Sequence, residues 1–96
     1  MRDAPEPLVF SRVEALRKHM LLTVAQMAKI VGVSRVTYSG WVDGKPMRAA
    51  NNLKVRAAVT KMFKAINEHE WPSPEIIGMT SPQRMKALLE LMGQSE

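Results

Sequence analysis

The chain has 96 residues, which suffices for one small domain and leaves no room for a second domain with its own core. It contains no cysteine, so disulfides and thiolate metal sites are excluded, and no apolar run approaches the roughly 18 residues of a membrane span. Hydrophobic residues make up 46% and aromatic residues only 5%, with eight methionines. We therefore expect a soluble, cytoplasmic globule whose core consists mainly of aliphatic side chains and Met.

Charge is unevenly distributed along the chain, whose net charge is +5. From Arg12 to Lys64 there are eleven Lys and Arg residues against two acids, whereas residues 65–96 hold two bases and five acids. A basic body of this kind predicts a polyanionic partner. The alternative is a helical surface that is simply basic and solvated.

The first predicted helix covers residues 11–21, after a polar, proline-containing lead-in at residues 1–10. Ser11 and Glu14 match the S-x-x-E capping box that starts many helices. Apolar residues recur on one face of this helix, at Val9, Val13, Leu16 and Met20.

Two short helices are predicted next, separated by a glycine. Thr23 and Gln26 form a T-x-x-Q capping box at the start of a helix over residues 23–31. Gly32 is a natural left-handed terminator of that helix. Ser34 caps the following helix, which we expect to end near residue 42.

A turn at Asp43-Gly44 leads to a longer helix over residues 49–69. Its predicted buried stripe is Val55, Val59, Met62, Phe63 and Ile66. The prolines after Trp71 end it and begin a connector. Ser81-Pro82 is interpreted as the cap and first turn of a last helix that runs to about residue 92. The stripe of that helix is Met85, Leu88, Leu89 and Met92. No strand pair is indicated, so we predict an all-α chain of five helices.

The region from Thr23 to Trp41 meets the physical requirements of a helix-turn-helix. Ala28 is small enough for two helices to cross closely, Gly32 tolerates positive φ in the turn, and Ser34 starts the next helix at once. Apolar residues suited to hold the pair against the core are Met27, Val31, Val33, Tyr38 and Trp41. We expect Trp41 and Tyr38 to be core residues.

These residues resemble the phage repressor and Cro-type helix-turn-helix family, also called the xenobiotic-response-element family. The resemblance covers residues 11 to about 66 and is strongest at Gly32-Val-Ser-Arg-Val-Thr37. Its last motif is Trp41-Val-Asp-Gly-Lys45. It implies a lambda-repressor-like domain over residues 11–70. Residues 71–96 are then a connector and a C-terminal helix, which packs on the domain or forms a homodimer seam.

The resemblance also implies how duplex DNA would be bound. The helix after Ser34 would enter the major groove and contact bases. The residues at base-contacting positions are Ser34, Arg35, Val36, Thr37, Ser39 and Gly40. The residues at backbone-contacting positions are Thr23 and Val24, at a helix N-terminus, and Lys45 and Arg48 in the following loop.

Three positions depart from the family pattern. Val24 stands where Gln is usual, and Gly40 stands where a long polar side chain is usual. Val36 occupies another base-contacting position, where it can touch a thymine methyl. Arg35 is left as the main candidate for a bidentate contact to guanine. We infer narrow sequence recognition, or affinity that depends mostly on phosphate contacts.

We therefore predict a DNA-binding transcription regulator, of phage or mobile-element type, that is not an enzyme and needs no cofactor. His19 and His69 are isolated, so no metal site is expected. The alternative is a protein-interaction module on the same fold, such as a phage factor that binds host transcription machinery or an antitoxin. No membrane partner is expected, because the apolar face of the helix over residues 49–69 is needed for the core.

Overall fold

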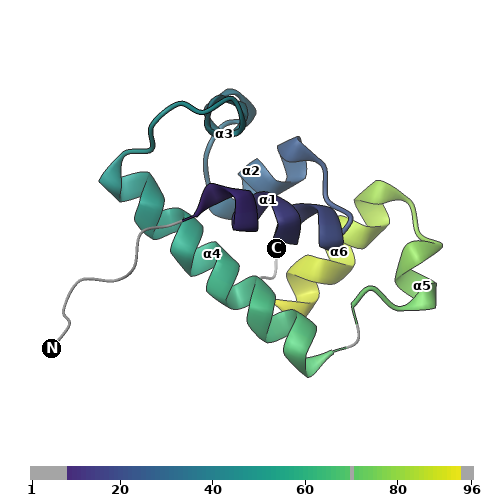
Figure 1. Cartoon of the computed structure of the whole chain (residues 1–96). Coiled ribbons are helices and arrows are strands. Elements are labelled where there is room, and N and C mark those ends of the chain that lie inside the picture. The colour runs from purple at the N-terminus through teal and green to yellow at the C-terminus, as the bar shows by residue number, and fades with distance from the viewer. Residues whose placement is uncertain (1–8, 70, 94–96) are drawn as a thin grey trace, which may run out of the picture.

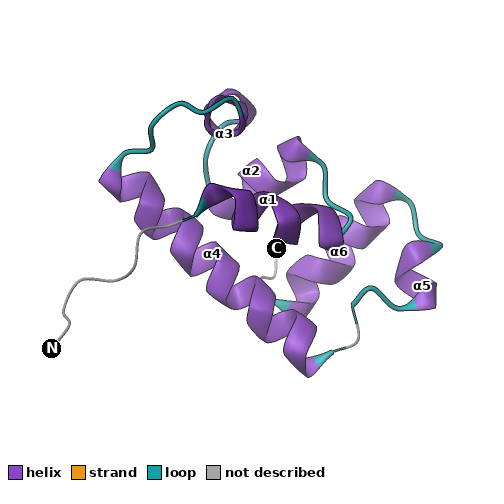
Figure 2. Ribbon diagram, in the orientation of Figure 1, coloured by secondary structure: helices purple, strands orange, loops and turns teal. Residues whose placement is uncertain are grey.

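The computed structural model describes residues 9–69 and 71–93, and this part of the chain is all-α (Figures 1 and 2). Apart from Val9 and Phe10, the predicted lead-in lies outside the described residues. These described residues form six helices, where five were predicted. They are α1 (Phe10–His19), α2 (Val24–Val31), α3 (Arg35–Val42), α4 (Ala49–Glu68), α5 (Pro74–Ile77) and α6 (Ser81–Leu91).

The additional helix, α5, is a single turn inside the predicted connector. The side chain of Ser73 accepts a hydrogen bond from the Ile76 amide at 3.3 Å, and Pro74 occupies the first turn. Proline is well suited to that position because its nitrogen has no proton to leave unpaired. The connector therefore contains a local helix signal that its proline content concealed.

The helices surround one core. α2 packs against both α3 and α4, and α1 packs against α3. Figure 1 shows α4 along one side of the molecule. In the same view α3 is seen along its axis whereas α2 lies across the view, so the two helices cross steeply.

The core confirms the expectation of aliphatic side chains and Met. The largest fully buried side chains are Tyr38, Met20, Met27, Met62, Leu88 and Val55. Tyr38 and Trp41 are both buried, as predicted, and pack with Phe10 at ring-centroid distances between 5.3 and 6.1 Å. These rings join the start of α1 to the inner face of α3.

The buried face of α4 only partly matches the predicted stripe, because Val59 and Ile66 are half-buried and Phe63 is exposed. Phe63 is 47% exposed, and the alanines Ala58 and Ala65 are buried instead. Val55 and Met62 are fully buried, so the buried face of α4 is centred on these two residues. Phe63 follows Met62 directly in the sequence, and its side chain therefore lies at the edge of that face. The buried face of α4 therefore alternates larger side chains with alanines.

The predicted start and end of α2 are confirmed. The Gln26 amide donates to Thr23 Oγ1 at 3.1 Å, and the Thr23 amide donates to Gln26 Oε1 at 2.9 Å. Gly32 adopts φ +94°, and its N–H reaches the Ala28 carbonyl at 2.9 Å. Ser34 caps α3 as predicted, since its Oγ accepts from the Thr37 amide at 3.0 Å.

Two other predicted caps are wrong. α1 starts at Phe10 and has no side-chain cap, because its N-cap residue is Val9, whose side chain cannot accept a hydrogen bond, and Ser11 lies inside the helix. The Glu14 carboxylate binds Arg17 and Tyr38. α6 is capped by Thr80, one residue before the predicted Ser81. A second T-x-x-Q box explains the shift: Thr80 and Gln83 exchange hydrogen bonds of 2.9 and 3.3 Å.

The C-terminal helix packs on its own chain. Met85 and Leu88 are buried in the common core, and Leu89 and Met92 are half-buried against it. The Gln26 side-chain amide also donates to the Ser81 hydroxyl at 2.8 Å, joining the first turns of α2 and α6. No helix in the described part of the chain combines the length and apolar character that a membrane crossing requires.

Candidate nucleic-acid interface

The outward face of α3 carries the residues predicted to contact bases. Arg35 and Val36 are exposed, and Val36 exposes 80% of its surface. Thr37 and Ser39 are half-buried. The opposite face holds Tyr38 and Trp41, so packing determines which face of α3 points to solvent.

The hydroxyl groups at the start of α3 are largely used within the helix. Ser34 Oγ accepts the Thr37 amide and donates its proton to Thr37 Oγ1 at 2.9 Å. Arg35 makes no hydrogen bond or ion pair with any described residue. The arginine is therefore the unpaired charged group of α3, with all five guanidinium donors available to a ligand.

Gly40, also predicted to contact bases, is buried. A Cβ atom placed on it would lie 3.1 Å from Cδ of Lys45 and within 3.9 Å of its Cβ and Cγ. Lys45 also donates its amide to the Gly40 carbonyl at 2.9 Å. The glycine thus exposes little surface of its own, because the stem of Lys45 lies against it.

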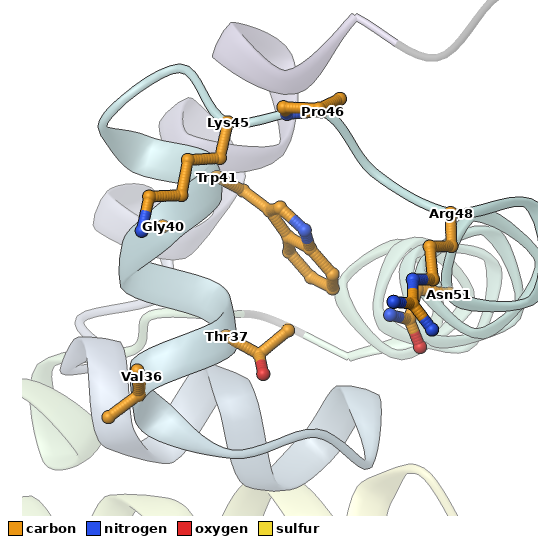
Figure 3. A pocket seen from close by; sticks show the side chains of 8 residues that line it. All are labelled: Val36, Thr37, Gly40, Trp41, Lys45, Pro46, Arg48 and Asn51. Atoms are coloured by element: carbon orange, nitrogen blue, oxygen red, sulfur yellow. The ribbon is translucent and has the colours of Figure 1, made fainter.

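A hollow of about 410 Å³ lies between α3 and the start of α4 (Figure 3). Trp41 projects into it from α3, while Arg48 and Asn51 face it from the other side. Its lining residues are Val36, Thr37, Gly40, Trp41, Lys45, Pro46, Arg48 and Asn51. The lining contains two cations and no acid, so this hollow is electrostatically suited to an anion.

The first turn of α2 also lacks acidic residues. Its capping box occupies the amides of Thr23 and Gln26. The Val24 side chain is half-buried and packs on the core. Val24 can therefore offer a ligand only its backbone amide, because its side chain packs on the core. A Gln at this position would also offer a polar side chain.

A partly buried polar cluster that the sequence did not predict links α1 to α3. The Tyr38 hydroxyl donates to Glu14 Oε2 at 2.7 Å, and Arg17 makes two hydrogen bonds of 2.8 Å to the same carboxylate. Arg17 also donates to the Leu22 carbonyl at 2.9 Å. The E-x-x-R spacing is visible in the sequence, but the tyrosine is 24 residues away.

The electrostatics of this cluster follow from its geometry. The hydrogen bonds from Arg17 lower the pKa of the Glu14 carboxyl, with a further contribution from Tyr38. Burial raises the pKa of Tyr38 far above its usual value, and the adjacent Glu14 carboxylate raises it further. The tyrosine therefore stays a neutral donor, and Glu14 stays ionised, across the physiological range.

The described residues contain no group of three or more His, Cys, Asp or Glu side chains placed to hold a metal ion. Comparisons with family models, with curated proteins and with solved structures found no match for this chain. Function must therefore be argued from the arrangement of α2, α3 and the loop between α3 and α4.

Proposed function

We propose that this chain is a DNA-binding transcription regulator with a lambda-repressor-like helix-turn-helix, in which α3 enters the major groove. The observation that carries the proposal is the outer face of α3. There Arg35 is exposed and unpaired, beside a hollow lined by Lys45 and Arg48 without an acid. A cationic surface without acids attracts a polyanion such as the phosphate backbone of a duplex.

The proposed contacts divide into two kinds. Arg48 and the amides of Val24 and Ala25, which the capping box leaves free, would hold phosphates, since a helix N-terminus favours an anion. Arg35 would donate to O6 and N7 of a guanine. Phosphate contacts fix the register of the protein, and the guanine contact distinguishes one sequence from another.

Val36 adds an apolar contact to this scheme. An isopropyl group that is 80% exposed gains little from water, whereas the C5-methyl of thymine is a matching apolar group in the major groove. Replacing thymine by deoxyuridine in the bound site removes only that methyl. We expect the replacement to weaken the wild type at one position and to leave Val36→Ala unaffected there.

Selection of bound sequences from a random duplex pool, at two salt concentrations, tests the proposal. We expect an enriched site whose affinity falls steeply with salt. Arg35→Ala should weaken the enriched site more than random duplex, and Arg48→Ala should weaken both. Lys86→Ala, an exposed lysine on α6, is the matched control and should change neither. Equal losses on all sequences for Arg35→Ala would contradict specific recognition.

A second candidate function is a protein-interaction module on the same fold, for host transcription machinery or as an antitoxin. It is favoured by the apolar exposure of α3, where Val36 is 80% and Val42 45% exposed. If no duplex binds even at low salt, this candidate replaces the first. A captured partner should then be lost with Val36→Asp and retained with Arg48→Ala.

Homodimer formation also belongs to the proposal, because two-fold pairing would place two copies of α3 on half-sites roughly 34–36 Å apart. Met85 and Leu88 of α6 are buried in the core of their own chain, so a dimer would form through another surface. Sedimentation of the free and DNA-bound protein tests this. A single copy on every selected site would overturn it.

A further inference from the structure

The side chain of Lys45 lies on α3, although the residue belongs to the loop that follows. Figure 3 shows it running back along α3, with its nitrogen beside Gly40. The stem occupies the space next to the glycine, with Cδ 3.1 Å from the point where a Cβ would stand. Its backbone is held there by the 2.9 Å hydrogen bond from Lys45 N to Gly40 O. Lys45 therefore fills the position of the side chain that residue 40 lacks.

Gly40 lies one helical turn beyond Val36 on the same face of α3. Residues four apart share a face, so the Lys45 ammonium and the exposed Val36 side chain point to the same side. One helical turn rises about 5.4 Å, and successive base pairs are stacked about 3.4 Å apart. A surface that brings Val36 to one base pair therefore brings Lys45 to another, one or two base pairs away.

We propose that Lys45 is a base-contacting residue that donates to a guanine in the major groove, rather than a backbone contact. This inference rests on the proposed function. The ammonium has three donors and no described partner, and guanine presents O6 and N7 as adjacent acceptors. Glycine at position 40 then has a specific purpose, which is to let the stem lie flat on α3. Across the hollow, Arg48 remains available to a phosphate.

The test uses the tightest duplex recovered from the random pool, with each guanine replaced in turn by 7-deazaguanine, which lacks the N7 acceptor but still pairs with cytosine. Lys45→Met is the informative variant, because it keeps most of the stem over Gly40 and removes the charge. Arg48→Met is the matched control, and Lys45→Arg tests rescue. Melting curves of all variants report whether they fold alike.

We expect the wild type to lose about fivefold in affinity at a guanine assigned to Lys45, the low end for loss of a base contact. At that guanine Lys45→Met should bind the two duplexes equally, whereas Arg48→Met and Lys45→Arg should retain the difference. The guanine should also stay sensitive in Arg35→Met, which separates it from a guanine bound by Arg35. It should lie one or two base pairs from the thymine sensed by Val36.

Two results would overturn the inference, and they can be told apart. If Lys45→Met keeps the wild-type sensitivity at every guanine and only lowers the salt slope by about one, Lys45 contacts a phosphate. In that case the proposed function stands. If the wild type binds no duplex at low salt, the proposed function fails and this inference with it.

Discussion

α2 and α3 are helices of equal length that differ in how they are held. Each has eight residues and begins at a hydroxyl cap, Thr23 or Ser34. α2 packs on α3 and α4, and the Gln26 side chain in its first turn is bonded to Ser81 of α6. α3 is packed on its inner face only, and on its outer face Arg35 has no described partner.

This difference indicates a division of roles between support and presentation. The inner face of α3 is immobilised by aromatic packing and by the hydrogen bond from Tyr38 to Glu14 of α1. In the proposed function, its outer face contacts DNA. A binding surface on a rigid element loses little conformational freedom when it engages, so the immobilised inner face prepares the outer one.

The largest loss of stability is expected for a substitution on the inner face of α3. Tyr38 is fully buried, so Tyr38→Ala should lower the free energy of unfolding by about 3–5 kcal/mol through the cavity it leaves. Val36→Ala, on the outer face, should change it by less than about 0.5 kcal/mol. Urea denaturation measures both. Similar losses for the two variants would remove the distinction between the faces.

The hydrogen bond between Glu14 of α1 and Tyr38 of α3 should make the free energy of unfolding depend on pH. The pKa of Glu14 is lowered in the folded state, so its contribution is present above the ordinary value of 4.5 and is lost as pH falls through the folded pKa. Glu14→Gln should be less stable at neutral pH and should lose less stability below pH 4.5. Unfolding free energies from pH 7 to pH 3 test this. A variant that loses as much stability as the wild type below pH 4.5 would contradict it.

The Ser34 cap of α3 should contribute a smaller amount to the free energy of unfolding. Ser34→Ala removes the acceptor for the Thr37 amide and should cost about 1 kcal/mol of unfolding free energy. Ser39→Ala, a matched change later in the same helix, should stay within about 0.5 kcal/mol. Thermal and urea unfolding distinguish them. If the two serines prove equivalent, the start of α3 does not depend on its cap.

The smallest change in the free energy of unfolding is expected for a substitution at Gly40. Unlike the preceding substitutions, this one should stabilise the protein. Gly40→Ala should stabilise the chain by up to about 1 kcal/mol through helix propensity, because the flexible Lys45 stem can shift by a few tenths of an ångström. Gly32→Ala is the control and should destabilise, since φ is +94° there. A loss of stability with Gly40→Ala would mean that the Lys45 stem is held more tightly than its exposure indicates.

Local signals predicted much of this fold. The Thr23 box, the Gly32 terminator and the Ser34 cap involve residues within about one helical turn of each other, so the pattern of residue types was sufficient. The Thr80 cap was equally local and was missed because Ser81-Pro82, one residue on, offers a competing signal. Whether the outward residues of α3 contact bases is still a prediction.

The sequence by itself determined the all-α class, the composition of the core, and the two capped helices around Gly32, because hydrophobic periodicity and capping act over a few residues. Only the tertiary structure decided that Glu14 leaves its predicted cap to join Arg17 and Tyr38, that Phe63 lies at the edge of α4, and that the Lys45 stem covers Gly40. These outcomes depend on which faces meet after packing, and residue spacing along the chain carries no such information.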